Sequence, residues 1–234
     1  MKLARFGLCV WASVFIVCAV PALAKPVFLT PAEYDPKLLL PPPPADDSAA
    51  ARAELAELER LQASRTPEQL ARAKSDGKTE NATIFRIAIG DGFDLSALPA
   101  TAKLLADVGH DEKAAAGAGK KFFLRNRPFI VDPSLQSCSK KEAPQSSYPS
   151  GHATMAYAMG VVLASLIPEK AQAILARAAD YAESRLICGV HYRRDIVAGE
   201  ALGTAVAVEL LHNARFRIEY DAAEHELKTA HLVE

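Results

Sequence analysis

Helical spacing of apolar residues is the feature that most constrains the fold of this chain. Leu55, Leu58 and Leu61 recur at three-residue intervals with charged residues between them, a pattern that predicts an amphipathic helix. The alternation of apolar and polar residues that builds strands is scarce. Two short apolar segments, Val27–Leu29 and Phe129–Val131, are too brief to build a sheet. We therefore predict an all-α fold, a compact helical bundle with irregular loops.

Local start signals divide the chain into separate helices. Asp46-Asp47-Ser48 offers N-cap residues to the leucine-containing helix. Thr66 followed by Pro67 and Gln69 has the pattern of a capping box with proline in the first turn. Five further helices are predicted, over Leu98–Val108, Ala114–Leu124, Ala153–Leu166, Pro168–Tyr181 and Ile196–His212.

Residues 1–24 are typical of a secretory signal peptide. Lys2 and Arg5 give a basic start, and the uncharged run Phe6–Ala24 ends in Ala22-Leu23-Ala24, the small residues of a cleavage site. An uncleaved membrane anchor is the alternative, because a run of 19 uncharged residues is close to the shortest membrane span. No later stretch is apolar and long enough to span a bilayer. We expect a soluble, exported protein, periplasmic or secreted, with no membrane contact after cleavage.

The charge balance excludes one class of partner. The chain has 27 Lys+Arg and 28 Asp+Glu, and signal cleavage would remove two basic residues and no acidic one, leaving 25 − 28 = −3. A protein that coats nucleic acid would carry a basic excess, so no nucleic-acid partner is expected. Half of the residues are hydrophobic and 24% are charged, which is typical of a soluble globular protein.

Prolines mark the start of the mature chain. The run Pro41–Pro44 favours polyproline II and does not enter a helix. We predict a proline-rich arm over residues 25–47, packed on the protein or tethering it, with docking of a partner as the alternative. The helical domain then covers residues 48–234.

Export changes how the cysteines are interpreted. Cys9 and Cys18 belong to the expected signal peptide, which leaves Cys138 and Cys188. In an oxidising compartment a disulfide is favoured over a metal site, and two separate buried thiols are the alternative. A bond between them would close a loop of about 50 residues, worth about 4 kcal/mol on the chain-entropy model.

Three segments carry residues suited to binding and transferring a charged group. In the first, basic side chains surround an aromatic pair: Lys120-Lys121-Phe122-Phe123-Leu124-Arg125-Asn126-Arg127-Pro128. Lys120 and Arg127 are seven residues apart, about two helical turns, and so can share a helical face. A solvated basic face that ends at a proline explains the same pattern.

The second segment, Tyr148-Pro149-Ser150-Gly151-His152, lies directly before a predicted helix. Unpaired amides and the helix dipole make a helix N-terminus favourable for an anion. Ser150 adds a hydroxyl, and Gly151 lets an oxyanion approach the backbone. An ordinary turn with His152 as a capping side chain is the alternative.

The third segment contains a histidine and an aspartate at a spacing of four, in Ser184-Arg185-Leu186-Ile187-Cys188-Gly189-Val190-His191-Tyr192-Arg193-Arg194-Asp195. On a helical turn this spacing puts the Asp195 carboxylate beside the His191 ring. A carboxylate on one ring nitrogen fixes the tautomer and leaves the other nitrogen free as a nucleophile or base. A surface His–Asp pair is the alternative.

Taken together, the segments resemble the tripartite signature of one superfamily. Lys120-x6-Arg127-Pro128, Pro149-Ser150-Gly151-His152 and Ser184-Arg185-x5-His191-x3-Asp195 match the type 2 phosphatidic acid phosphatases and the vanadium haloperoxidases at every signature position. Within that superfamily the chain most resembles the bacterial class A non-specific acid phosphatases. The filling Tyr192-Arg193-Arg194 departs from the usual pattern and adds two positive charges beside the site.

The resemblance implies a helical bundle of the acid phosphatase and vanadium haloperoxidase type, and a phosphohistidine mechanism. His191 attacks phosphorus, Asp195 holds its other ring nitrogen, and His152 protonates the leaving oxygen and then activates water. An acidic optimum follows, because His152 must start protonated. Five residues are expected to surround the phosphoryl oxygens: Lys120, Arg127, Ser150, Gly151 and Arg185.

The expected substrates are small-molecule phosphate esters, and the resemblance implies a homo-oligomer. Three fixed cations and helix-terminal amides can neutralise the phosphoryl charge without a metal, so no metal and no cofactor are expected. Hydrolysis of nucleotide di- or triphosphates is the main alternative, and phosphate transfer onto alcohols is left open. A vanadium haloperoxidase would use the same residues to hold vanadate, but those enzymes are usually much larger. A membrane lipid phosphatase would need spanning helices. A catalytically silent phosphate-binding or adhesive module, using the proline arm, is the alternative from a different class.

Overall fold

The computed structural model describes residues 25–233, so the expected signal peptide lies outside the described residues. The all-α prediction is confirmed, since every element between residues 25 and 233 is a helix. In chain order the helices are α1 (Pro36–Leu39), α2 (Ala49–Ser64), α3 (Pro67–Asp76), η1 (Ala82–Phe85), α4 (Arg86–Ile89), α5 (Pro99–Phe123), α6 (Pro128–Val131), α7 (Gly151–Leu166), η2 (Pro168–Lys170), α8 (Ala171–Ile187), α9 (Arg193–His212) and α10 (Ala214–Thr229).

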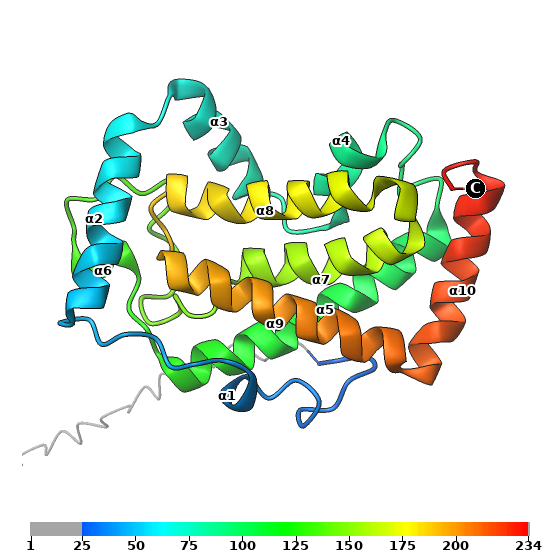
Figure 1. The fold of residues 1–234 in the computed structure, drawn as a ribbon, viewed down its shortest axis with the longest axis horizontal. Coiled ribbons are helices and arrows are strands. Elements are labelled where there is room, and N and C mark those ends of the chain that lie inside the picture. The colour runs from blue at the N-terminus through cyan, green and yellow to red at the C-terminus, as the bar shows by residue number, and fades with distance from the viewer. Residues whose placement is uncertain (1–24, 234) are drawn as a thin grey trace, which may run out of the picture.

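Helix α7 forms the centre of the bundle. It packs against α5, α8 and α9, while α10 covers one end of the bundle and α2 stands at the other (Figure 1). Its sequence is apolar around most of its circumference, which is typical of a helix surrounded by other helices. The N-terminus of this buried helix therefore has a fixed position relative to its three neighbours.

The crossing of α7 and α9 depends on two glycines. A Cβ on Gly199 or on Gly203 would collide with the backbone of Ser150 or Thr154. The absent side chains let the two helices approach more closely than larger residues would allow. This close approach brings the first turn of α9 next to the start of α7.

The helix starts predicted at Ser48 and at Thr66 are confirmed. The Ser48 side chain accepts the Ala51 amide at the start of α2. At the start of α3, Thr66 and Gln69 cap each other's backbone amides. These caps are set by residues three positions apart, which explains why the sequence alone identifies them.

Two helices predicted over Leu98–Val108 and Ala114–Leu124 are wrong as separate elements, because α5 runs through both ranges without a break. The intervening Gly109 costs only about 1 kcal/mol in a helix interior, too little to interrupt a helix packed on both sides. Asp111, which lies between the two predicted ranges, does not cap a helix start. Its carboxylate instead accepts the backbone amides at residues 27–29 over 2.8–3.3 Å.

Other helix boundaries also differ from the sequence prediction. Helix α8 continues to Ile187, six residues beyond the predicted end, and α10 was not predicted at all. The apolar segment Phe129–Val131 belongs to the short helix α6. In α10 charged residues outnumber the buried ones, and its buried face is specified by contact with α5 and α9.

The proline-rich segment packs against the helical domain. Phe28, Leu29, Tyr34 and Leu40 are buried in the main core cluster. Within residues 25–233, no helix combines the length and the apolar character that a membrane crossing requires.

Candidate active site

Segments far apart in the sequence meet at the N-terminus of α7. The Ser150 amide donates to the Asp195 backbone carbonyl over 2.9 Å. A Cβ built on Gly151 would lie 3.2 Å from the Lys120 Nζ, close to the end of α5. The Arg127 Nη1 lies 2.9 Å from the His191 Nε2. The three predicted segments therefore come together in space.

His191 contacts a carboxylate through one ring nitrogen and a guanidinium through the other. Its Nδ1 lies 3.3 Å from Asp195 Oδ2, and its Nε2 lies 2.9 Å from Arg127 Nη1. Because a guanidinium only donates, Nε2 accepts and the proton is on Nδ1, where it is donated to Asp195. The Nε2 lone pair therefore points toward the Arg127 guanidinium.

The side chains of His191 and Asp195 meet, but the prediction that both lie on one helical turn is wrong. Helix α9 begins at Arg193, so His191 lies in the turn before the helix and Asp195 in its first turn. The Tyr192 amide donates to Asp195 Oδ2 over 2.9 Å, which fixes the carboxylate at the helix start.

Asp195 is held by more groups than the histidine. Its Oδ1 accepts from Arg125 Nη1 over 2.6 Å, and its Oδ2 accepts from the Ser147 hydroxyl over 2.6 Å. The other guanidinium nitrogen, Arg125 Nη2, donates to Glu54 Oε2 over 2.6 Å. Asp195, Arg125 and Glu54 are all buried. A row of charged residues thus extends from α2 to the His191 ring.

The ionisation of this pair follows from its burial and its charged neighbours. Burial raises the pKa of Asp195 to about 6, although the Arg125 guanidinium acts in the opposite direction. Burial also lowers the pKa of His191 well below its ordinary value, and Arg127 and Arg185 lower it further. At neutral pH the pair is therefore a neutral imidazole beside a carboxylate.

His152 is in a more open environment on the other side of the site. Its Nδ1 lies 3.1 Å from Glu80 Oε1, and its ring stacks on Tyr181 with the centroids 5.7 Å apart. Its buried Nε2 has no hydrogen-bond partner among residues 25–233. Burial lowers the pKa of His152 well below its ordinary value, as do the nearby charges of Arg185 and Lys120.

Three basic side chains lie around the two histidines. Burial and the charge of Arg127 lower the pKa of Lys120 to about 8. Burial lowers the pKa of Arg127 to about 10, and it also lowers that of Arg185. All three stay charged at acidic pH, and their mutual repulsion favours the binding of an anion between them.

Lys120 and Arg127 do not share a helical face, contrary to the prediction. Helix α5 ends at Phe123, and Leu124 follows in a left-handed conformation with φ 50°. The chain then turns back, and the Arg127 amide donates to the Pro144 carbonyl over 2.8 Å. This turn, which the sequence did not indicate, brings Arg127 to the site.

Ser150 and Gly151 form the start of α7. The Ser150 hydroxyl accepts the Ala153 amide over 3.4 Å as an N-cap, and Ser150 is fully buried. Gly151 is the first residue of the helix and lines the pocket described below. The structure therefore shows Ser150 as the cap of the helix whose N-terminus faces the basic groups.

The two additional arginines before Asp195 contribute less charge to the site than the sequence indicated. Arg193 forms ion pairs with Glu57, over 2.8 Å, and with Glu183. Arg194 is exposed, and its backbone amide donates to Glu54 Oε1 over 2.8 Å. The Arg193 charge is thus compensated by two carboxylates that the sequence pattern did not indicate.

Cys138 and Cys188 have the geometry of a disulfide, with an S–S distance of 2.19 Å and a Cα–Cα distance of 4.9 Å. The Cys138 amide also donates to the Cys188 carbonyl over 2.9 Å. The link joins the loop after α6 to the chain three residues before His191.

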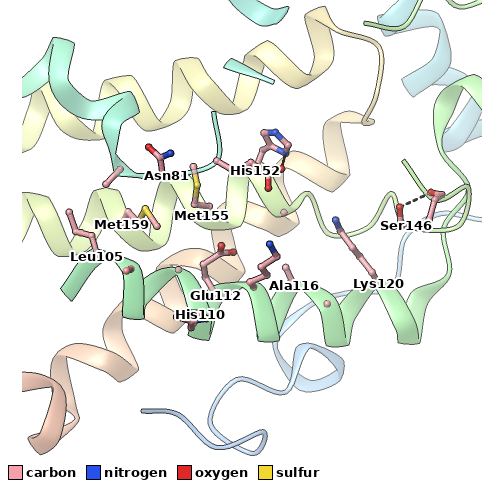
Figure 2. Close-up of a pocket in the computed structure, with 18 of the residues that line it drawn as sticks. Asn81, Leu105, His110, Glu112, Ala116, Lys120, Ser146, His152, Met155 and Met159 are labelled. Atoms are coloured by element: carbon pink, nitrogen blue, oxygen red, sulfur yellow. Dashed lines mark hydrogen bonds and ion pairs between the residues drawn. The ribbon is translucent and has the colours of Figure 1, made fainter. Parts of the chain in front are cut away.

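A pocket of about 660 Å³ lies against His152, Lys120 and Gly151 (Figure 2). His191 and Arg127 are 1% and 3% exposed and do not line it. The pocket therefore reaches the site from the His152 side.

Across residues 25–233, no group of three or more His, Cys, Asp or Glu side chains is placed to hold a metal ion.

The comparison with protein families matches residues 102–219 to the PAP2 superfamily. This range contains all three segments, most of α5, and helices α7, α8 and α9. The chain belongs to the PAP2 superfamily.

Relatives within the PAP2 superfamily include bacterial acid phosphatases. The chain is 34% identical to an acid phosphatase of Zymomonas mobilis over 150 residues, which are 62% of this chain and 56% of that protein. It is 30% identical to a non-specific acid phosphatase of Providencia stuartii, over 62% of this chain and 60% of that protein. The match to a Salmonella typhi non-specific acid phosphatase is 34% over 38% of this chain and 37% of that protein. The chain thus matches between 37% and 60% of the length of these relatives.

A solved PAP2 structure has the same fold. The crystal structure of a transmembrane PAP2-type phosphatidylglycerolphosphate phosphatase from Bacillus subtilis matches with a TM-score of 0.52 and 17% identity. The match covers 70% of this chain and 86% of that chain. At this identity the likeness shows the fold alone.

Several residues that shape this PAP2 site were not predicted. Glu54 and Glu80 come from α2 and from the loop after α3, and in the sequence they resemble ordinary surface acids. Arg125 lies within the basic segment, which the sequence analysis singled out for its charge. Its buried position between Asp195 and Glu54 did not follow from the spacing of the residues.

Proposed function

We propose that the protein is an exported acid phosphatase that hydrolyses phosphate monoesters through a phosphohistidine on His191. The observation that carries the proposal is the orientation of His191. Asp195 holds Nδ1, and Nε2 faces the Arg127 guanidinium. A neutral imidazole fixed in this way is a nucleophile directed at the position where cations bind the phosphoryl oxygens.

In the first step, His191 Nε2 forms a bond to phosphorus while the bond from phosphorus to the ester oxygen breaks. Arg127 releases its contact with Nε2 and binds a phosphoryl oxygen instead. The leaving oxygen takes a proton from His152, whose Nε2 lacks a partner within the described residues. Asp195 stabilises the positive charge that develops on the phosphorylated ring.

In the second step, water attacks phosphorus and the bond from phosphorus to Nε2 breaks. His152, now neutral, accepts a proton from the water. Inorganic phosphate leaves, and His191 returns to its neutral form with the proton on Nδ1.

Charge neutralisation accounts for much of the expected rate enhancement. Phosphoryl transfer requires alignment and electrostatic stabilisation more than covalent help. Lys120, Arg127 and Arg185 provide three cations, and the amides at the start of α7 add the helix N-terminus. We assign Ser150 and Gly151 to this group of phosphate-binding residues.

Export and the oligomeric state also belong to the proposal. The features of residues 1–24 and the geometry of Cys138 and Cys188 both fit a protein that folds in an oxidising compartment. N-terminal sequencing of the protein recovered from the periplasm or the medium tests export, with Lys25 as the expected first residue. Sedimentation of the mature protein tests the homo-oligomer.

Rapid quenching into alkaline detergent, with p-nitrophenyl phosphate labelled in its phosphoryl group, tests the chemistry, because a phosphohistidine survives alkali and is lost in acid. We expect acid-labile, alkali-stable label on the wild-type protein and none on His191→Ala, together with loss of turnover in this variant. His152→Ala should accumulate label, because p-nitrophenolate leaves without protonation while attack by water is slowed. Label retained on His191→Ala would refute the assignment of the nucleophile.

A further inference from the structure

The pocket beside His152 extends well beyond the phosphate-binding residues. On α5 its lining residues follow one helical face, at spacings of three and four: Leu105, Gly109, Glu112, Ala116 and Lys120. Fifteen residues separate the two ends of this face, a length of about 22 Å. Figure 2 shows Lys120 toward one end of the row and Leu105 toward the other.

Helix α7 forms the opposite wall. His152, Met155 and Met159 line the pocket at spacings of three and four, starting from the phosphate-binding end (Figure 2). Leu105 adds apolar surface at the far end, and Leu95 also lines the pocket. The character of the pocket thus changes along its length, from basic at the start of α7 to apolar one to two turns later.

Small residues keep this far part open. A Cβ on Gly109 would lie 3.1 Å from the Met159 Cε, so the absent side chain leaves room for the methionine. Ala102, Ala106 and Ala116 line the same wall. Methionine adapts its shape to irregular apolar ligands, which suits a binding surface.

One carboxyl group lies inside the pocket, between its basic and apolar parts. Glu112 is 6% exposed, and its carboxyl group forms no hydrogen bond or ion pair with residues 25–233. Burial raises its pKa well above the ordinary value, and the charge of Glu80 adds to this effect. Two other polar side chains that line this part, His110 and Lys113, are exposed. Burial thus favours the neutral form of the Glu112 carboxyl group inside the pocket.

We propose that this part of the pocket, the apolar arm, binds the ester group of the substrate and makes the enzyme prefer phosphate monoesters with an elongated apolar ester group. The apolar arm consists of Leu95, Leu105, Gly109, Glu112, Met155 and Met159. The inference rests on the proposed function, since a phosphoryl group held between Lys120 and His152 leaves its ester oxygen facing the pocket. It adds a substrate class and the residues that select it.

A chain-length series tests the proposal. We would measure kcat/KM for ethyl, butyl, hexyl and octyl phosphate, each below the concentration at which micelles form. Each methylene that enters the apolar arm should raise kcat/KM by roughly twofold to fourfold, as expected for the burial of an apolar CH₂ group. The increase should stop once the arm is filled.

Two variants locate the effect. Gly109→Leu places a side chain in the middle of the arm and should lower the ratio of kcat/KM for octyl and ethyl phosphate at least tenfold. Ala106→Trp narrows the far end and should affect only the longest substrates. The matched control is Ala176→Leu, at an exposed alanine of α8 that does not line the pocket, and it should leave the ratio unchanged. Melting temperatures verify that each variant folds.

Binding of n-alkyl phosphonates, which are not hydrolysed, separates this inference from the proposed function. Hydrolysis of every ester at equal kcat/KM, with equal phosphonate affinities, would reject the apolar arm and retain the phosphatase. Phosphonate affinity that increases with chain length, without any hydrolysis, would reject the phosphatase and retain the arm. The proposal would also be overturned if kcat/KM increased with ester chain length equally in wild type and in a folded Gly109→Leu variant.

Discussion

The two histidines of the site differ in how firmly they are held. His191 is 1% exposed, and both of its ring nitrogens have partners. Behind it, Asp195, Arg125 and Glu54 continue a buried row of charged groups. His152 has one ion-pair partner, Glu80, whose side chain is 56% exposed, and its Nε2 is unpaired within the described residues.

This difference matches the two tasks in the proposed mechanism. A nucleophile must keep one tautomer and one orientation through the reaction, and a buried, fully paired network provides both. A general acid and base must change its protonation twice in each cycle and exchange protons with substrate and water. A ring that borders the pocket and has few fixed partners is suited to that exchange.

The largest effect on activity is expected from Asp195→Asn. An amide can donate to His191 Nδ1, which would move the ring proton to Nε2 and remove the nucleophilic lone pair. We expect kcat to fall roughly a thousandfold or more, the order found when the carboxylate that orients a catalytic histidine becomes an amide. Single-turnover kinetics measure this loss, with Asp180→Asn at a half-exposed ion pair of α8 as the control. Activity within tenfold of wild type would contradict the proposed role of Asp195.

Arg125→Met tests whether the row behind His191 acts as a unit. The substitution leaves Asp195 and Glu54 buried with no cation between them. Removing one partner of a buried ion pair costs about 3–5 kcal/mol, measurable by urea unfolding. The double variant Arg125→Met/Glu54→Gln should recover part of the loss, because it removes one uncompensated charge. Equal stability of Arg125→Met and wild type would show that the row contributes nothing to folding.

How much the sequence reveals differs between the two sides of the site. His191, Asp195, His152 and the basic residues could be proposed as candidates because their types and order follow a signature within three short segments, and the structure brings them together. Glu54 and Glu80 were missed because their roles depend on contacts with residues far away in the sequence: Glu54 contacts Arg125 and the Arg194 amide, and Glu80 contacts His152. Such contacts between distant segments leave no periodic pattern in one sequence.

The fold shows the same limit. The all-α class and the helix starts at Ser48 and Thr66 could be predicted, because apolar periodicity and capping are local. The continuity of α5 through Gly109 could not, because packing on both sides of the helix outweighs the low helix propensity of glycine. The reversal at Leu124 likewise depends on contacts with a loop some twenty residues away.

Removal of the disulfide tests how the chain before His191 is held. Cys138 and Cys188 are separated by 50 residues, so loss of the bond in Cys138→Ser/Cys188→Ser should cost about 4 kcal/mol of stability on the chain-entropy model. Calorimetry with and without reductant checks this value. We also expect lower activity, because the bond anchors the turn that carries His191. If melting temperature and activity both stay unchanged under reductant, the bond has no role in positioning the site.

The smallest predicted effect concerns the pH dependence that His152 imposes. Its pKa is depressed by burial and by Arg185 and Lys120, so kcat/KM should fall as the pH rises through a value below the ordinary histidine pKa. Bound phosphate ester adds negative charge beside the ring and raises this pKa, so the decrease in kcat should occur at higher pH than the decrease in kcat/KM.

Glu80→Gln tests whether the protonation of His152 sets this pH dependence. The Glu80 carboxylate lies 3.1 Å from His152 Nδ1 and favours the protonated ring, so its removal should move the decrease in kcat/KM to still lower pH. The shift should be a fraction of a pH unit, because the exposed Glu80 side chain is screened by solvent. Glu59→Gln, at an exposed position of α2, is the matched control. A shift to higher pH, or an equal shift in the control, would mean that His152 is not the group whose protonation limits the reaction.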